Sequence, residues 1–409
     1  MTGVRAPARR RLLVLVLLAT AVMTVLGYAL KAQCIDDYNA DRDRLLCSND
    51  VQVLYTNRGL GEKHFPYVDG RLDENGNLSG GVIEYPVLTG LFAWVAALPV
   101  SSEGGYLTST AILLAPFSLL TAFLLVQMVR WRALVYALAP PLVWYSFHNW
   151  DLLVVCACVA AFSQWWRGRT VWASVLLAVG ASLKTWPGFF VLPLALERWK
   201  AGDRRGAGLV VGAAVGTFAL LNGPFALVNY DGWWAPYAFQ GRRGADITSN
   251  SIWFWAGEKL TTDQLNHLIP VLLLAAFAGA LAYGYTRPGR YPFVQVCGAM
   301  LCAFMLLNKA HSPQYALWLL PFFALLRLEW GWVTAYLAFD AVLYIGLFRW
   351  FYGLGHGEDF GIPKQMLVIG VWGRAVMLVL LFVVFLRSRS ALDDDDAAPQ
   401  EQPRELVAA

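Results

Sequence analysis

The sequence predicts an all-α protein that crosses a membrane many times. The chain has 409 residues, of which 58% are hydrophobic and 15% are charged, and its mean hydropathy is +0.49. Soluble domains carry about 25% charged residues. Many apolar runs approach the roughly 20 residues that a helix needs to cross a bilayer. Basic residues form short clusters between these runs rather than a basic face, so nucleic-acid binding has no support.

The first apolar run covers residues 12–30 and follows a cluster of arginines that includes Arg9, Arg10 and Arg11. This charge pattern resembles a signal peptide, but the run is longer than the usual 7 to about 15 residues of a signal sequence. We therefore expect an uncleaved first transmembrane helix with a cytoplasmic N-terminus.

Short basic loops set the predicted topology, because Lys and Arg are enriched in cytoplasmic loops. All of these loops become cytoplasmic if residues 83–100 do not span the membrane. Pro86 and about 15 apolar residues suit a juxtamembrane helix on the outer surface. The basic residues concerned are Arg5, Arg130/Arg132, Arg167/Arg169, Arg198/Lys200/Arg204/Arg205, Arg287/Arg290, Arg327 and Arg387/Arg389.

About twelve transmembrane helices follow, with both termini inside and a long first extracytoplasmic loop at 32–105 that carries the juxtamembrane helix. Several spans are short, and short helices are tolerated where they line a cavity. We expect one domain over residues 1–390 and a disordered acidic cytoplasmic tail at 391–409. The spans are expected at 12–31, 106–129, 133–147, 151–166, 171–184, 186–197, 207–228, 267–285, 292–307, 314–327, 330–351 and 365–387.

The outer face collects the polar loops in this topology. The cytoplasmic loops leave no room for a nucleotide-binding domain, and no glycine-rich phosphate-binding motif opens a helix, so ATP-driven transport has no motif support. The outer segments are 32–105, 147–151, 183–188, 229–266, 308–314 and 352–364.

The first outer loop contains two cysteines and several acids. An extracytoplasmic loop favours a disulfide between Cys34 and Cys47, with two free thiols as the alternative. Asp36 and Asp37 lie in "CIDDYNADRDR", where acids and arginines alternate as in a salt-bridged surface segment. Asp50 instead starts "DVQVLYTNRGL", whose apolar spacing predicts a short amphipathic helix on the membrane surface.

Three ionisable residues, Asp151, Lys184 and Lys309, lie within or between apolar runs. Such a residue is by default a functional hypothesis, because a charge in a membrane is costly. The structural alternative is a helix cap or a side chain that reaches to water. All three come to the outer membrane surface, where an acid and two lysines suit a phosphorylated ligand.

Loop 229–266 is rich in Trp and Tyr and contains the adjacent pair Arg242 and Arg243. Aromatic rings stack on sugar faces, and neighbouring arginines suit phosphate. An interfacial aromatic belt explains most of the Trp residues, but it explains "GRRG" poorly.

Five segments occur in an order and spacing that resemble the GT-C superfamily of polyprenyl-phosphate-sugar-dependent glycosyltransferases. They are "NDVQVLYTNRGL", "EYPVLTGLFAW", "HNWDLLVV", "SLKTWPGFFVLPLAL" and "KAHSPQYALWLLP". The chain looks most like glycosyltransferase family 87, an actinobacterial group that includes α-mannosyltransferases, and the resemblance runs through nearly the whole chain. It implies a GT-C-like fold in which an Asp of the first outer loop deprotonates an acceptor hydroxyl, which attacks the donor sugar with inversion.

By this resemblance the catalytic base is Asp50. Many GT-C members carry a paired acid here, whereas Asn49 and Val51 flank Asp50 in this chain, so Asp36 and Asp37 stay as rivals. Cations near a phosphate leaving group stabilise it. The candidates for that role, in order, are Lys184, Lys309, Arg242 and Arg243; Asp151 is expected to position donor or acceptor, and Arg58 and His311 complete the substrate-binding set.

The resemblance predicts an enzyme of the bacterial plasma membrane that moves a hexose, mannose by family analogy, at the extracytoplasmic face. Its partners would be a lipid-linked sugar donor, a glycolipid or cell-wall glycan acceptor, and membrane lipids. The alternative is a transporter or flippase of a lipid-linked sugar, which predicts internal repeats, and none is traceable. No cofactor is expected; the sugar, the acceptor and metal dependence stay open, since no His/Asp cluster has metal-ligand spacing.

Overall fold

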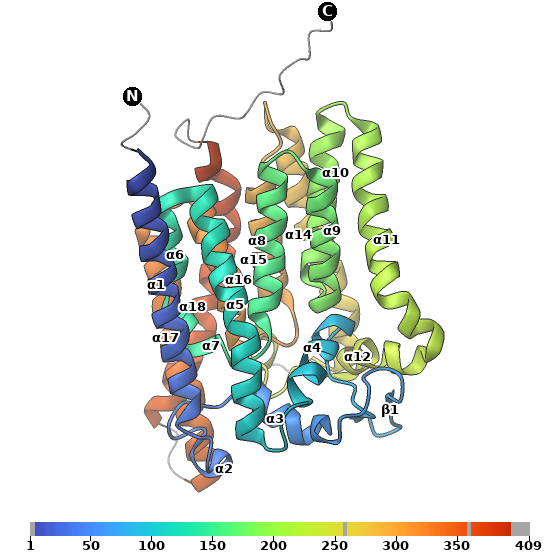
Figure 1. Ribbon diagram of the computed structural model, residues 1–409, viewed down its shortest axis with the longest axis vertical. Helices are drawn as coiled ribbons and strands as arrows, with labels where there is room; N and C mark the ends of the chain where they lie inside the picture. The colour runs from blue at the N-terminus through green and yellow to red at the C-terminus, as the bar shows by residue number, and fades with distance from the viewer. Residues whose placement is uncertain (1–4, 257–259, 358–360, 394–409) are drawn as a thin grey trace, which may run out of the picture.

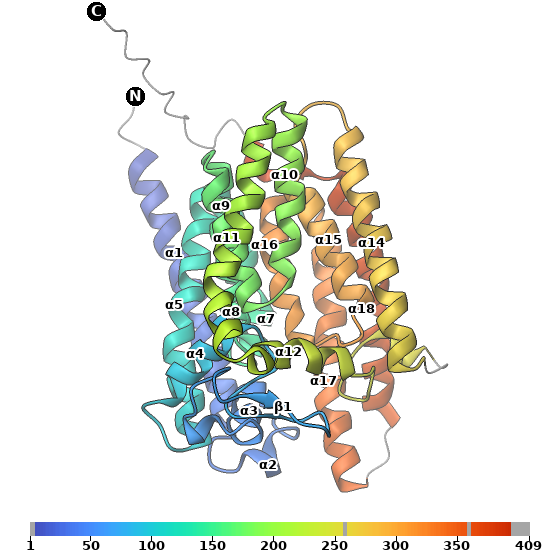
Figure 2. The ribbon, with the colours of Figure 1, turned by 90° about the vertical axis from the view of Figure 1, so that its right-hand side faces the viewer.

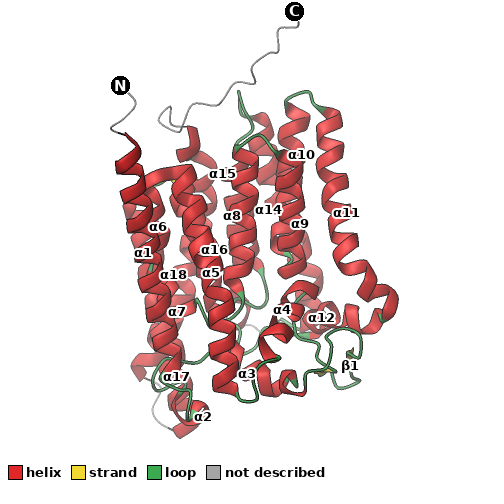
Figure 3. Ribbon diagram, viewed as in Figure 1, coloured by secondary structure: helices red, strands yellow, loops and turns green. Residues whose placement is uncertain are grey.

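The chain forms a helical bundle in the computed structural model, which describes residues 5–256, 260–357 and 361–393. Helices make up nearly all of the regular structure, and the strands are pairs of two residues each (Figure 3). The all-α class predicted from the apolar runs is therefore confirmed. Most of the tail expected at 391–409 lies outside the described residues.

Six helical stretches of the described chain are long and apolar enough to cross a membrane, in agreement with a multi-pass membrane protein. The predicted number of about twelve spans stays a prediction. The six stretches contain α1 (Arg5–Ala32), α5 (Glu103–Val129), α11 (Arg204–Val228), α14 (Thr262–Thr286), α17 (Trp330–His356) and α18 (Gly361–Arg387).

Shorter helices pack among the long ones. Every residue of the ten-residue helix α16 is buried, so protein rather than lipid surrounds it, as expected for helices too short to cross a bilayer alone. The group comprises α8 (Asp151–Trp166), α9 (Thr170–Leu183), η3 (Trp186–Phe190), α10 (Val191–Lys200), α15 (Phe293–Leu307), η4 (Pro313–Tyr315) and α16 (Ala316–Leu325).

The span predicted at 133–147 is wrong as a single helix. The chain there forms η2 (Arg130–Ala133), α6 (Leu134–Ala137) and α7 (Pro140–Tyr145). Ala139 is extended, with φ −69° and ψ 128°, because the residue before a proline is disfavoured in the α region. The break at Pro140 therefore follows from local stereochemistry.

The loop predicted at 229–266 contains helices instead. Its first half is α12 (Tyr230–Arg242), which starts where the Asn229 side chain accepts a hydrogen bond of 3.1 Å from the Gly232 N–H. An Asn at this position is a strong helix N-cap. A short helix, α13 (Ile252–Trp255), follows, and α12 crosses one end of the bundle (Figure 2).

The first polar loop is folded against the same end as α12 (Figure 1). The helix expected from Asp50 is present as α3, with Asn49 as its N-cap. Its apolar residues Val51, Leu54 and Tyr55 are buried in the core of the protein, and its place on the membrane surface stays a prediction. Segment 83–100 forms a helix of only 11 residues, which is shorter than a bilayer-spanning helix. The loop contains α2 (Tyr38–Asp41), α3 (Asp50–Asn57), η1 (Leu60–Glu62), the antiparallel pair β1 (Arg71–Leu72) and β2 (Leu78–Ser79), and α4 (Val87–Ala97).

Several basic loops meet at the opposite end, beside the N-terminus of α1 (Figure 1). The Arg132 Nε donates to the Ala324 carbonyl at 2.9 Å, and the Arg287 side chain donates to the Leu386 carbonyl at 3.0 Å. Strand β3 (Leu326–Arg327) pairs with β4 (Arg389–Ser390), just before η5 (Ala391–Asp393). The bundle thus has a basic end and a polar-loop end, as the charge pattern predicted.

A disulfide joins Cys34 and Cys47 in the first loop, and both residues are buried. The Tyr38 ring packs in the same cluster. Its hydroxyl donates to the Asn49 carbonyl at 2.7 Å and accepts from the Asn49 N–H at 2.8 Å. The crosslink therefore holds the segment from which α3 starts.

A buried ion pair, which sequence analysis missed, joins the two long C-terminal helices. Arg374 of α18 donates to Asp340 of α17 at 3.1 Å, and the two side chains are at most 1% exposed. The Tyr145 hydroxyl lies 3.4 Å from the same carboxylate oxygen. The overlooked signal was a single charge in the middle of each of two apolar runs, which marks a structural or functional role in a membrane protein.

We expect loss of the disulfide to destabilise the folded protein. Replacing both cysteines, Cys34→Ser and Cys47→Ser, should lower the free energy of unfolding by about 3 kcal/mol, because the crosslink restricts the unfolded chain. Thermal unfolding of detergent-solubilised protein with and without dithiothreitol measures this. Reductant should lower the Tm of the wild type and leave the double variant unaffected; a wild-type Tm that ignores reductant would contradict the prediction.

Removal of one member of the Asp340–Arg374 pair should cost more than removal of both. Arg374→Met leaves a buried carboxylate without its cation and should lower the free energy of unfolding by about 3–5 kcal/mol. The double variant Asp340→Leu/Arg374→Met should be closer to wild type, because no charge is then left unpaired. Unfolding in mixed detergent micelles, followed by tryptophan fluorescence, gives both values, and equal losses for single and double variants would refute the pair's role.

Candidate active site

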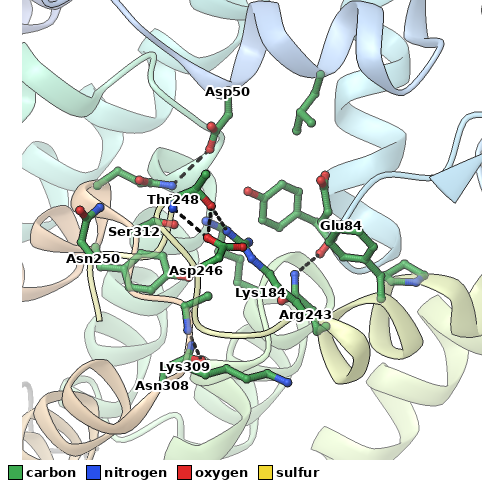
Figure 4. A pocket seen from close by; sticks show the side chains of 18 of the residues that line it. Asp50, Glu84, Lys184, Arg243, Asp246, Thr248, Asn250, Asn308, Lys309 and Ser312 are labelled. Atoms are coloured by element: carbon green, nitrogen blue, oxygen red, sulfur yellow. Dashed lines mark hydrogen bonds between the residues drawn. The ribbon is translucent and has the colours of Figure 1, made fainter. Parts of the chain in front are cut away.

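A cavity of about 1100 Å³ opens at the polar-loop end of the bundle. This volume is slightly above the ~300–1,000 Å³ typical of ligand pockets, so it has room for two substrates. Segments far apart in sequence line it, including α3, residues 74–76, residues 84–86, His148, residues 184–186, α12 with the loop that follows it, residues 308–310 and 312–315, and α17. Figure 4 shows charged side chains from several of these segments turned toward one another.

Asp50 lies on the cavity wall at the start of α3, and its side chain is 38% exposed. Its backbone N–H donates to the His148 carbonyl at 2.7 Å, which fixes the start of α3 against the turn before α8. The Asn149 side chain donates to Asp50 Oδ2 at 2.7 Å. The Oδ1 atom has no hydrogen bond in the described structure, so it is free to take a proton.

The surroundings of Asp50 increase its basicity. Burial raises the pKa of this carboxyl above its ordinary value, although the Asn149 hydrogen bond and the charges of Lys184, Arg243 and Lys31 act in the opposite direction. A carboxylate with a raised pKa is a stronger base at neutral pH. Asp50 is therefore suited to proton abstraction.

His148 faces the free oxygen of Asp50 without forming an ion pair. Burial lowers the pKa of His148 well below its ordinary value, and the Lys31 charge adds to this effect, so the ring is neutral. Its Nδ1 lies 2.9 Å from the Ser48 carbonyl, which only accepts, so Nδ1 carries the proton. The unprotonated Nε2 lies 4.0 Å from Asp50 Oδ1, and two acceptors thus flank one part of the cavity.

Asp151 and Lys184 meet beneath the cavity. Asp151 is fully buried as the first residue of α8, and its carboxylate accepts from Lys184 Nζ at 2.7 Å and from Trp318 Nε1 at 2.6 Å. Lys184 Nζ also lies 4.8 Å from the Tyr85 ring centroid and 5.6 Å from that of Tyr315. Lys184 lines the cavity, whereas Asp151 lies behind Lys184 and does not line the cavity. The Asp151 side chain does not cap α8, contrary to the alternative considered from the sequence.

Arg242, Arg243 and Lys309 form a group of cations on the cavity wall, and none of the three pairs with a carboxylate in the described part of the chain. Lys309 Nζ donates to Asn266 Oδ1 at 2.6 Å, and Arg243 donates to Thr248 Oγ1 at 3.2 Å. Burial and the nearby Arg243 charge lower the pKa of Lys309. Their positive charge is available to an anion.

Arg58 also lines the cavity, but Glu84 neutralises it in an ion pair. His311 does not line the cavity, so the prediction that it binds substrate directly is not supported by its position. It is 5% exposed, and its ring contacts the Arg374 guanidinium. The backbone carbonyl of His311 accepts from the Asn250 N–H at 3.0 Å, so His311 joins the cavity loops to α18.

The rival acids lie away from the cavity. Asp36 and Asp37 are exposed and do not line it. The Asp37 side chain accepts from the Ala40 N–H at 3.2 Å and so caps α2. Of the three candidates for the base, only Asp50 is placed to contact a ligand in the cavity.

Sequence analysis missed several residues of the cavity wall. His148 and Gln314 lie inside the segments "HNWD" and "KAHSPQY" that were singled out for their charges, so uncharged neighbours deserved equal weight. Glu84 likewise opens the quoted segment "EYPVLTGLFAW", whereas Asp246 and Asn250 had no signal beyond their place in loop 229–266. Among the described residues, no group of three or more His, Cys, Asp and Glu side chains could hold a metal ion.

The sequence model of glycosyltransferase family 87 matches residues 85–308, which is more than half of the chain. No curated protein sequence matches this chain. The matched region runs from Tyr85 on the cavity wall, through the Asp151–Lys184 pair and the two adjacent arginines, to Asn308. The family indicated by the sequence motifs is thereby confirmed, and with it the assignment as a membrane glycosyltransferase. The chain belongs to glycosyltransferase family 87.

Proposed function

We propose that this membrane glycosyltransferase moves a hexose, mannose, from a polyprenyl-phosphate-sugar donor to a glycolipid or cell-envelope acceptor at the extracytoplasmic face. The observation that carries the proposal is the composition of the cavity wall. It presents Asp50, a carboxylate with one oxygen free of hydrogen bonds, together with Arg242, Arg243 and Lys309, three cations that have no carboxylate partner among the described residues. A base for a hydroxyl and cations for a phosphate are the two requirements of transfer from a sugar phosphate.

The reaction follows from this arrangement. Asp50 Oδ1 takes the proton of an acceptor hydroxyl as the hydroxyl oxygen attacks the anomeric carbon of the donor. The bond between the anomeric carbon and the phosphate oxygen breaks, and the lipid phosphate leaves with the bonding electrons. Attack from the side opposite the leaving group inverts the anomeric configuration.

The pairing of the charges changes the order of the candidates for the phosphate site. Lys184, the first candidate from sequence, is already compensated by Asp151 at 2.7 Å. Arg243, Arg242 and Lys309 have no carboxylate partner in the described structure, so their charge is free to stabilise the phosphate as it leaves. We assign them to the leaving group and Lys184 to the floor of the site.

Two features support an extracytoplasmic site. The cavity and the polar loops lie at the end opposite the basic loops, and basic loops favour the cytoplasm. The disulfide between Cys34 and Cys47 joins the segments that flank α2, which lies at the cavity end (Figure 1), and disulfides persist in oxidising compartments.

Exposed apolar residues support a lipid-linked donor. Leu227 and Val228, at the end of α11, are 89% and 67% exposed, and Trp234 of α12 is 45% exposed. Pro236, Tyr237 and Phe239 of the same helix α12 line the cavity. A lipid carried along this apolar surface therefore comes next to the site.

Asp50→Asn should reduce transfer by about 10²–10⁴-fold, because it removes the base and little else. The assay uses full-length protein in lipid, radiolabelled polyprenyl-phosphate mannose and a lipid extract from the producing cells. Asp36→Asn is the matched control and should keep full activity. In the wild type, the acid limb of the pH–rate profile should lie above the ordinary Asp range of about 3.9, because activity is lost once the carboxyl is protonated.

Loss of transfer in Asp36→Asn but not in Asp50→Asn would show that Asp36, not Asp50, is the catalytic base. Absence of transfer by the wild type with several sugar donors would instead favour a transporter or flippase of a lipid-linked sugar.

Neutralising the cations should weaken binding of the sugar donor rather than binding of the acceptor. We expect Arg243→Gln and Lys309→Gln each to lower kcat/KM for the donor by about 10–100-fold, since each removes a charged hydrogen bond to phosphate. Arg205→Gln, an exposed arginine at the basic end, is the control and should change little. A larger effect on the acceptor KM than on the donor KM would contradict the assignment.

A further inference from the structure

Two buried amide side chains on the cavity wall have polar atoms without a hydrogen-bond partner in the described structure. Gln314 is 1% exposed and Asn250 is 4% exposed, and both line the cavity. The Oε1 atom of Gln314 and both polar atoms of the Asn250 amide have no partner in the described structure. Buried polar groups are nearly always paired, so these atoms point to a ligand that completes them.

Gln314 lies directly beside the proposed base. Its Nε2 is 3.5 Å from Asp50 Oδ2, the oxygen that also accepts from Asn149 at 2.7 Å. The unpaired Oε1 belongs to the same amide, so the amide beside the carboxylate is the one that lacks a partner. A molecule that donates a proton to Asp50 therefore comes within reach of the Gln314 amide.

Asn250 is held on the neighbouring stretch of backbone. Its N–H donates to the His311 carbonyl at 3.0 Å, and His311 precedes the short helix η4 that carries Gln314. The flanking residues Ser249 and Ser251 are each 1% exposed. The two amides thus belong to adjoining, packed segments of one wall.

The chemistry of the pair selects the ligand. An amide offers a donor and an acceptor, as does a sugar hydroxyl. A phosphate presents acceptors alone and is served by the cations Arg242, Arg243 and Lys309 on the same cavity wall. Neutral amides next to a carboxylate base match a neutral ligand with several hydroxyls.

We propose that Gln314 and Asn250 form the acceptor-sugar subsite, in which they bind hydroxyls that neighbour the one deprotonated by Asp50. The acceptor is accordingly a glycan or a glycolipid head group, not a lipid alcohol with one hydroxyl or a protein side chain. This inference rests on the proposed function and specifies its acceptor class.

The test measures binding without turnover. Radiolabelled octyl α-mannoside, a sugar with a short lipid tail, is titrated onto full-length protein in lipid nanodiscs without donor. Gln314→Met and Asn250→Leu have side chains of similar size with no hydrogen-bonding groups, and each should weaken binding by about tenfold. With donor present, Gln314→Met should raise the KM for octyl α-mannoside more than it lowers kcat.

Gln295→Leu is the matched control. Gln295 is 7% exposed, and its amide nitrogen donates to the Ser388 carbonyl at 3.5 Å, near the basic end. It should bind octyl α-mannoside as the wild type does. Gln314→Asn, which keeps the amide, should recover part of the lost affinity.

Each outcome decides the inference. Wild-type affinity in both Gln314→Met and Asn250→Leu would overturn it, as would an equal loss in Gln295→Leu. If Gln314→Met does not fold, the Asn250→Leu result carries the test. Wild-type protein that binds octyl α-mannoside through Gln314 but transfers no sugar from polyprenyl-phosphate mannose would support the subsite and refute the proposed reaction.

Discussion

The buried ion pair between Asp151 and Lys184 is the interaction on which the site depends. A charge removed from water is retained in an apolar bundle only when a partner compensates it. This pair fixes the first residue of α8 against the residue that follows α9, and Trp318 brings α16 to the same carboxylate at 2.6 Å. Three short helices therefore meet at one point, and the cavity opens above it.

This pairing also decides which charges are left for a substrate. Lys184 is compensated by Asp151, and Arg58 is compensated by Glu84. Asp50 accepts hydrogen bonds but forms no ion pair within the described structure, because the nearby His148 is neutral. The cavity wall consequently offers Asp50 as a base and three cations, Arg242, Arg243 and Lys309, for a phosphate. The proposed division between an acceptor side and a donor side follows from this arrangement.

Asp50 is held from two directions by groups that carry no charge. The disulfide and Tyr38 fix Asn49, which caps α3. The His148 carbonyl accepts from the Asp50 N–H at 2.7 Å and ties α3 to the turn before α8. A base positioned mainly by backbone contacts keeps an oxygen free, and the amide of Gln314 beside it, whose Oε1 is unpaired in the described structure, provides a place for the rest of an acceptor.

The sequence by itself determined the helical membrane class, the amphipathic helix that starts at Asp50 and the separation of a basic end from a polar end. These features follow from the length of apolar runs, from helical spacing and from the charge of arginines, all of which are local. Only the tertiary structure decided that Asp151 lies behind Lys184, that His311 contacts Arg374 rather than the cavity, and that Gln314 lies beside Asp50. Gln314 and Asp50 are 264 residues apart in the chain, and no local pattern specifies which buried group a distant side chain meets, because that choice is made by packing.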